Sequence, residues 1–212
     1  MALLLGIDTG GTYTDAVLFD PQSGDPAAGV AASAKALTTR HDLSEGIRNA
    51  MAAVLTPERS RAIELVCLST TLATNSIVEG QGSAICLVLI GYTPDMLDQV
   101  GLREVMAGDP VVFLPGGHDA AGSEAAPLDL DAALEAVLRH APEVAAFAVS
   151  GYFSVRNPAH ENQVRRLIRE HCGLPVTCGH ELTSNLHASR RALTAALNAR
   201  LIPLLGELIL SV

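Results

Sequence analysis

One tight turn near the start of the chain gathers residues whose types and spacing could do chemistry. Residues 6–15 read GIDTGGTYTD, so Asp8 follows an apolar run and precedes two glycines flanked by threonines. A glycine pair between apolar runs favours a hairpin turn with positive φ and leaves the backbone N–H groups open to a ligand. Successive N–H groups in such a turn form a concavity that binds anions. The turn therefore predicts a phosphate-binding site.

Asp8 is the residue of this turn best placed to hold a metal ion. A carboxylate at a strand end can hold a hydrated Mg²⁺ that bridges phosphate groups. Asp15, just after the turn, either assists the metal or is a solvated strand residue. The residues predicted to contact phosphates through N–H groups and hydroxyls are Thr9, Gly10, Gly11, Thr12 and Thr14. In the simplest alternative, the glycines only close a hairpin and Asp8 forms an Asx turn.

A second polar segment follows a short apolar run at residues 65–68. It reads STTLATN over residues 69–75 and is predicted to start a helix, whose free N–H groups favour an anion. Thr71 and Asn75, together with Thr70, would then face the γ-phosphate or the substrate, which makes Thr71 and Asn75 candidate catalytic residues. Capping of the helix by Ser69 or Thr70 explains the same residues without a ligand.

Other polar residues carry weaker patterns. Four residues offer the side-chain types of a metal site at irregular spacing, namely His118, His180, Glu181 and His187. Their loop positions favour solvated or capping roles. Asn157 and Pro158 are typical of a helix start, and His160 is interpreted in the same way. Arg190 and Arg191 are expected to pair with acidic neighbours or with a further lobe.

Composition and charge exclude several classes of partner. The net charge is −9 and Lys35 is the only lysine, which argues against nucleic acid and anionic membranes. The four cysteines lie far apart without a CxxC pair, as expected for reduced thiols rather than a disulfide framework or a zinc site. The sequence shows no basic N-terminal region before its first apolar run, and no apolar span of 18 residues is apparent. We therefore expect a cytoplasmic protein without a signal peptide or a membrane helix.

The order of the expected elements favours an α/β fold. Strands are predicted at residues 2–7, 16–19 and 30–37, and a helix at 42–54 begins with a capping box. Strands then alternate with helices, with strands expected at 65–68, 84–90, 111–114, 144–149 and 175–178 and helices at 130–138, 157–171 and 185–209. Pro203 is expected to bend the last helix. This order is the ribonuclease H-like plan, a mixed sheet with antiparallel strands first and parallel strands after, flanked by helices.

Five motifs in order resemble those of one known family. The GIDTGGTYTD turn resembles the first phosphate motif of the actin, sugar-kinase and heat-shock-chaperone ATPase superfamily. The STTLATN segment resembles a segment of the hydantoinase/oxoprolinase family, and NPAHE at residues 157–161 is similar to that family's helix start. The remaining matches are KALTT at 35–39 with Glu45 and Gly46, and the tail from Arg190 through Thr194, Asn198 and Ala199 to Pro203.

The resemblance implies the N-terminal region of a hydantoinase A or 5-oxoprolinase-type subunit, the first lobe of an actin-like ATPase fold. It implies ATP and Mg²⁺ as cofactors, a small cyclic amide as substrate and a hydantoinase B-type partner subunit or domain. ATP would phosphorylate the ring amide oxygen before water opens the ring. Residues 1–212 are expected to be one domain of a longer protein whose second lobe lies elsewhere. A related ATP-dependent carboxylase subunit and a non-catalytic nucleotide-binding sensor lobe stay as alternatives, and oligomerisation stays open.

Overall fold

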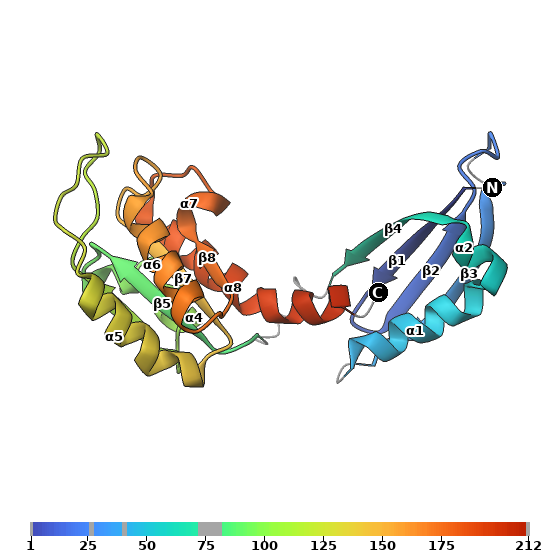
Figure 1. Cartoon of the computed structure of the whole chain (residues 1–212), viewed down its shortest axis with the longest axis horizontal. Helices are drawn as coiled ribbons and strands as arrows, with labels where there is room; N and C mark the ends of the chain where they lie inside the picture. The colour runs from blue at the N-terminus through green and yellow to red at the C-terminus, as the bar shows by residue number, and fades with distance from the viewer. Residues whose placement is uncertain (1, 26–27, 40–41, 72–81, 211–212) are drawn as a thin grey trace. The chain divides into compact units, whose positions relative to one another are not determined.

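The computed structural model describes residues 2–25, 28–39, 42–71 and 82–210, which form two compact units. Unit 1 comprises residues 1–81 and 205–212, and unit 2 comprises residues 82–204 (Figure 1). The chain passes from unit 1 into unit 2 after the fourth strand, and the last helix returns it to unit 1. The sequence pattern does not predict this division.

Unit 1 is built on a mixed four-stranded sheet. Its strands are β1 (Leu3–Thr9), β2 (Tyr13–Phe19), β3 (Val30–Leu37) and β4 (Ile63–Thr70), in the order β3-β2-β1-β4. The first three strands pair antiparallel, and β4 pairs parallel to β1. The predicted mixed sheet, with antiparallel strands first, is confirmed.

One face of this sheet carries the core of unit 1. Side chains alternate between the faces of a strand, so Leu5 and Ile7 of β1 lie on the same face as Leu18 of β2, and all three are buried. The helix α1 (Leu43–Val54) lies along β2 and β3 (Figure 1) and buries Ile47. The Asp42 carboxylate accepts a hydrogen bond from Ser44 N at 2.9 Å, which confirms the predicted helix start. A short helix, α2 (Pro57–Arg61), precedes β4.

Strand β4 differs from the prediction of a short buried strand followed by a helix from Ser69. It extends to Thr70, because Ser69 and Thr70 continue the parallel pairing opposite Asp8 and Thr9. Leu65 is 51% exposed. Leu65 lies opposite Leu4, on the face of the sheet that α1 does not cover.

Unit 2 is a parallel sheet between two layers of helices. Its strands are β5 (Ile85–Ile90), β6 (Val111–Leu114), β7 (Ala146–Gly151) and β8 (Val176–Cys178), in the order β6-β5-β7-β8, and all adjacent pairs are parallel. Every residue of β5 and β7 is buried, as expected for strands covered on both faces.

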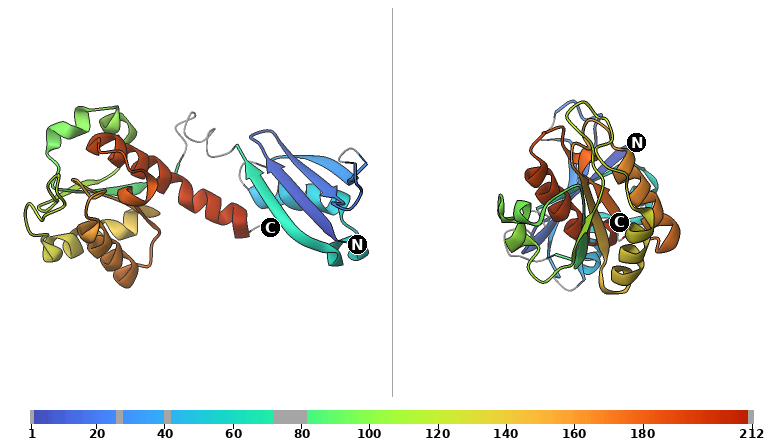
Figure 2. Two further views of the ribbon diagram at one scale, coloured as in Figure 1. Left: turned by 90° about the horizontal axis from the view of Figure 1, so that it is seen from above. Right: turned by 90° about the vertical axis from the view of Figure 1, so that its left-hand side faces the viewer.

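Alternate residues of β5 contribute to two separate cores. Leu87 packs in the core that includes α8 (Ala188–Leu210), η1 (Pro94–Asp98) and α4 (Leu102–Val105). Val88 packs in the core that includes α5 (Leu130–His140) and α6 (Ala159–His171). Figure 2 shows α8 and α5 on opposite sides of this sheet. The short elements η2 (Ala141–Glu143) and α7 (Gly179–Leu182) complete the unit.

Three helices of unit 2 depart from their predicted details. Apolar residues at positions 130, 133, 134, 137 and 138 of α5 have the spacing of one helix face, but the buried face differs from it. Ala133, Ala136 and Val137 are buried, while Leu130 and Leu138 are exposed. The helix α6 begins at Ala159, where Asn157 Oδ1 accepts a hydrogen bond from the Ala159 N–H. The helix α8 begins at residue 188 rather than 185 and contains Pro203, and the bend expected there stays a prediction.

By length and composition alone, α8 could cross a membrane, in contrast to the expectation of no membrane helix. Core helices of globular proteins meet the same criteria, and one such helix is weak evidence. The alanines Ala192, Ala195 and Ala196 of this helix are fully buried in the core beside β5. The part of α8 that belongs to unit 2 is therefore a core helix.

Candidate functional site

The predicted turn of unit 1 is a hairpin, but its glycines act differently from the prediction. Gly10 N donates to Tyr13 O at 2.9 Å, and Thr38 N donates to Thr12 O at 2.9 Å. Neither Gly10 nor Gly11 is among the described glycines with positive φ, so that prediction is wrong. A Cβ at Gly10 would lie 3.2 Å from Tyr13 O. Gly10 is therefore suited to the close approach of two backbone segments.

A row of four polar residues crosses the open face of the sheet next to this turn. Asp8 lies directly opposite Asp15 on β2 and Ser69 on β4, and Asp15 lies opposite Lys35 on β3. Directly paired residues share a face of the sheet, with Cβ atoms about 4.5–5.5 Å apart. The pairing therefore brings the two predicted metal ligands, Asp8 and Asp15, to one face.

The two aspartates of this row have different partners. The Asp15 carboxylate forms an ion pair with Lys35 Nζ at 2.9 Å. Asp8 is exposed and forms no ion pair with any residue that the structure describes. An unpaired carboxylate is free to take a cation or its hydration shell, so Asp8 fits a metal ligand better than Asp15 does.

A hollow lies beside the row because Gly6 has no side chain. The adjoining row on the same face consists of Cys67, Gly6 and Val17. A Cβ at Gly6 would meet no atom closer than Val17 O at 3.9 Å. The resulting pocket measures about 310 Å³ and is lined by Gly6, Ile7, Asp8, Asp15, Val17, Cys67, Leu68 and Ser69. Its size is at the lower end of small-molecule sites, about 300–1,000 Å³.

The predicted threonines divide between the two faces. Thr9 and Thr14 are fully buried on the face of α1, where Thr14 Oγ1 lies 3.0 Å from Thr38 Oγ1. Thr9 Oγ1 is buried without a hydrogen-bond partner among the described residues. Thr12 is exposed at the turn. The hydroxyls of Thr9 and Thr14 thus lie on the opposite face from Asp8, which corrects the expectation of one shared rim; a role in phosphate binding stays a prediction.

The STTLATN segment reaches the same turn as far as it is described. Thr71 N donates to Thr9 O at 3.3 Å, and Thr71 is exposed. Thr71 Oγ1 would lie 3.7 Å from a Cβ at Gly10. The structure therefore brings Thr71 beside the hairpin. Asn75 lies outside the described residues.

The four residues considered as metal ligands in unit 2 do not meet. Glu181 pairs with Arg165, and His187 Nδ1 accepts a hydrogen bond from Arg190 N at 3.4 Å. His118 is buried rather than solvated, and its ring lies 4.4 Å from that of His160. Burial and the neighbouring His160 lower the pKa of His118. His180 instead bonds to Glu161.

Two residues interpreted as helix-start or surface groups have buried roles. His160 Nδ1 accepts from Gly117 N at 3.0 Å, and its Nε2 lies 3.0 Å from Glu124 Oε1. Arg191 is fully buried and donates to the carbonyls of Asn185 and Gly151 at 2.9 and 2.8 Å. The expected pairing of Arg191 with an acidic neighbour is wrong within the described residues.

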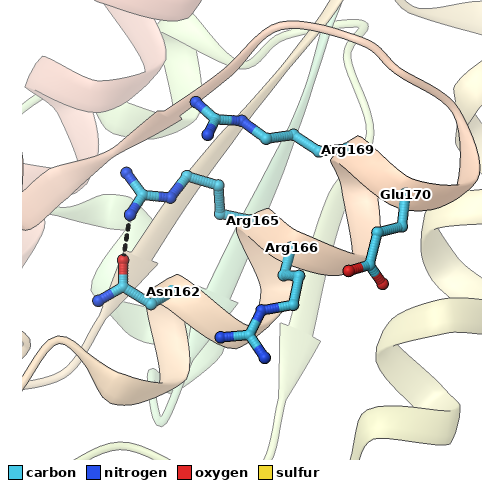
Figure 3. A pocket seen from close by; sticks show the side chains of 5 residues that line it. All are labelled: Asn162, Arg165, Arg166, Arg169 and Glu170. Atoms are coloured by element: carbon cyan, nitrogen blue, oxygen red, sulfur yellow. Dashed lines mark hydrogen bonds between the residues drawn. The ribbon is translucent and has the colours of Figure 1, made fainter.

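A second pocket, of about 490 Å³, lies along α6 in unit 2. Its lining residues are Asn162, Arg165, Arg166, Arg169 and Glu170, all from this one helix (Figure 3). Arg165 bonds to Asn162 and to Glu181. The pocket contains no residue from a strand end, and we interpret it as a solvated helix face.

The mixed sheet of unit 1, with antiparallel strands first and a parallel strand after, is the sheet of the predicted first lobe of an actin-like ATPase fold. The chain belongs to the hydantoinase/oxoprolinase family, because the sequence model of the hydantoinase/oxoprolinase N-terminal region matches residues 4–172. The predicted family is thereby confirmed; the tail motif from Arg190 to Pro203 lies outside the matched residues.

Two curated relatives match most of the chain. Caprolactamase subunit alpha of Pseudomonas jessenii is 33% identical over 231 aligned positions, which cover 97% of this chain and 32% of the relative. Acetophenone carboxylase gamma subunit of Aromatoleum aromaticum is 32% identical and covers 93% of this chain and 31% of the relative. The chain thus spans about a third of the length of these relatives.

Two solved structures share the fold. The ATP-dependent caprolactamase from Pseudomonas jessenii has a TM-score of 0.73 at 30% identity, covering 97% of this chain and 32% of that chain. A nucleotide-free acetone carboxylase has a TM-score of 0.68 at 22% identity, covering 93% and 32%. Because the acetone carboxylase is only 22% identical, its similarity shows the fold alone.

Proposed function

We propose that this chain supplies the phosphate-binding lobe of an enzyme that uses ATP and Mg²⁺ to open a cyclic amide. The observation that carries the proposal is the polar row beside the Gly6 hollow, with Asp8 unpaired at its centre. The ATP-dependent caprolactamase of 30% identity supports the use of ATP and the cyclic-amide class.

Each residue of the row has a defined task in this proposal. Asp8 would hold Mg²⁺ through its hydration shell, and the bound ion would neutralise charge on the phosphate oxygens. Lys35 is already bound to Asp15 and reduces the negative charge around Asp8, which favours an approaching triphosphate. Ser69 and the Thr71 hydroxyl, on the other side of Asp8, are hydrogen-bond donors for a phosphate oxygen.

The chemistry proposed for ATP is activation of a poor electrophile. Transfer of the γ-phosphoryl group to the ring amide oxygen breaks the bond to the bridging oxygen of ADP and forms a new P–O bond. Water would then add to the amide carbon and the ring C–N bond would break, which frees the amine and leaves an acyl phosphate. A second water would hydrolyse the acyl phosphate, giving the carboxylate and releasing phosphate with the former amide oxygen. A hydantoinase B-type partner subunit belongs to the proposal, and the naming of both curated relatives as subunits supports it.

A second candidate function is an ATP-dependent carboxylase subunit. It is supported by the acetophenone carboxylase gamma subunit, which is as similar in sequence as the caprolactamase subunit is. Both functions need the phosphate site, and they differ in the molecule that accepts the phosphoryl group.

One assay of the full-length protein with its partner subunit separates these functions. ATP hydrolysis is measured with ε-caprolactam, hydantoin or 5-oxoproline, and with acetophenone plus bicarbonate. Stimulation by a cyclic amide supports the hydrolase, and stimulation that requires bicarbonate overturns it in favour of the carboxylase. Nucleotide binding without turnover under every condition would support a sensor lobe and contradict both enzymes.

A further inference from the structure

The carboxyl edge of the parallel sheet in unit 2 has the topology of a ligand site. The strand order β6-β5-β7-β8 places the second strand on one side of the first strand and the third on the other. The winding therefore reverses between β5 and β7. In open parallel sheets, ligands bind outside the carboxyl ends of the strands at this point. Here the two strands end at Ile90 and Gly151.

Buried polar residues of unit 2 gather at this edge. Except for Thr177, each described buried polar residue of the unit is near the end of β7, in a loop that follows a strand, or in the first turn of α6 or α8. They are His118, Ser150, Ser154, His160, Glu161, Ser189 and Arg191. Ser154 Oγ and Arg191 Nε have no hydrogen-bond partner among the described residues. Burying polar groups costs stability, so their concentration at one edge indicates a functional surface.

Two buried ionisable side chains hold the end of β7 from both sides. Glu161 Oε1 accepts from Gly151 N at 2.7 Å, and Arg191 Nη2 donates to Gly151 O at 2.8 Å. Gly151 in turn fixes the start of the following loop, where Tyr152 N donates to Ile90 O at 2.8 Å and Tyr152 O accepts from His118 N at 3.0 Å. The backbone that carries Tyr152 is therefore rigidly positioned.

Aromatic rings cluster in the loops that follow β5 and β7. The chain has only three tyrosines and four phenylalanines and no tryptophan, yet Tyr92, Tyr152 and Phe153 meet here. The Tyr92 hydroxyl is buried between Ser150 Oγ at 2.8 Å and the Ala188 carbonyl at 3.0 Å. Tyr152 is 36% exposed and packs edge-on against the Tyr92 ring at 5.9 Å. Phe153 has a φ of 52°, an uncommon conformation for a bulky residue.

We propose that this carboxyl edge binds a small neutral molecule with an apolar ring and an amide or carbonyl group, and that Tyr152 is its anchor. The exposed ring offers an apolar face together with a hydroxyl that can bond to a carbonyl. Arg191, the buried cation of this edge, is fully enclosed and engaged by two backbone carbonyls, so it offers no counter-charge to an anionic ligand. The class of molecule rests on the proposed function, whose substrate is a cyclic amide.

Calorimetry measures binding at this site directly. The full-length protein is titrated with ε-caprolactam, hydantoin and 2-piperidone without nucleotide. We expect at least one of them to bind saturably to the wild type and with unchanged affinity to Tyr13→Phe. Tyr152→Phe, which keeps the ring and its packing but removes the hydroxyl, should weaken the affinity several-fold. Tyr152→Ala should weaken the affinity at least tenfold.

Two outcomes overturn the inference: none of the three amides binds, or an amide binds to Tyr152→Phe and to Tyr152→Ala with the affinity of the wild type. A separate measurement of ATP hydrolysis in Asp8→Asn distinguishes this failure from failure of the proposed function. If Asp8→Asn abolishes hydrolysis while no amide binds, the inference falls and the phosphate site stands. If Asp8→Asn hydrolyses ATP normally while Tyr152 binds an amide, the phosphate site falls and the inference stands.

Discussion

Removing the Glu161 carboxylate should destabilise unit 2 far more than removing an exposed carboxylate does. Glu161 is fully buried and accepts from Gly151 N at 2.7 Å and from His180 N at 3.0 Å, and it also bonds to His180 Nδ1. Glu161→Ala leaves these donors without an acceptor, and leaving one buried donor unsatisfied costs about 1–3 kcal/mol.

The total expected loss for Glu161→Ala is about 3–5 kcal/mol, the range for removing one member of a buried charged network. Domains are stable by only about 5–15 kcal/mol, so this loss is large. Arg191 holds the same residue, Gly151, from the opposite side. The loss in the double variant Glu161→Ala/Arg191→Met should therefore differ from the sum of the two single losses by about 0.5–3 kcal/mol.

The assay is urea unfolding followed by circular dichroism and tyrosine fluorescence, since Tyr92 and Tyr152 both lie in unit 2. Glu135→Gln is the matched control, because Glu135 forms an exposed pair with Arg139 on α5. The control should change the unfolding free energy by no more than about 0.5 kcal/mol. A loss below about 1 kcal/mol for Glu161→Ala would refute the reasoning, as would additivity in the double variant.

Three further predictions concern the hollow, the thiols and His118. Gly6→Ala should fold normally, because its Cβ finds open space, but should weaken binding of Mg·ATP; unchanged affinity in calorimetry would contradict the pocket assignment. Burial raises the pKa of Cys86 and Cys178 to about 12, so a thiol reagent at pH 8 should modify the exposed Cys67 well before it modifies Cys86 or Cys178. Mg·ATP should slow the modification of Cys67, and mass spectrometry of labelled peptides checks both points. The pKa of His118 is lowered in the folded state, so the unfolded state takes up the proton first and stability should fall as the pH drops below about 6.5. His118→Asn should flatten this pH dependence of the unfolding free energy between pH 7 and 5. An identical slope in the variant would exclude His118 as the source of the dependence.

Local signals along the chain predict the strands and helices well. The hairpin, the third strand and the Asp42 helix start follow from apolar runs and polar breaks at their ends. The exposure of β4 could not be predicted, because an apolar run has the same composition at an edge as in the centre of a sheet. The division into two units depends on which strands pair, and composition does not encode pairing between distant segments.

The candidate site was predicted in part. Asp8 and the turn follow from the sequence, but the roles of Gly6 and Lys35 depend on register across three strands. Side chains alternate between the two faces of a strand, so the sequence alone indicates that Thr9 and Asp8, and likewise Thr14 and Asp15, lie on opposite faces. The buried roles of His160 and Arg191 were missed, because both bond to backbone groups far away in the sequence.

The central claim is tested most directly by ATP hydrolysis in Asp8→Asn and Asp15→Asn of the full-length protein with its partner subunit. Both changes remove one negative charge from adjacent positions on the same face, but only Asp15 is paired with Lys35. We expect Asp8→Asn to lower kcat about 100-fold or more, and Asp15→Asn to lower it far less. Equal, small effects of both variants would contradict a metal–phosphate site centred on Asp8.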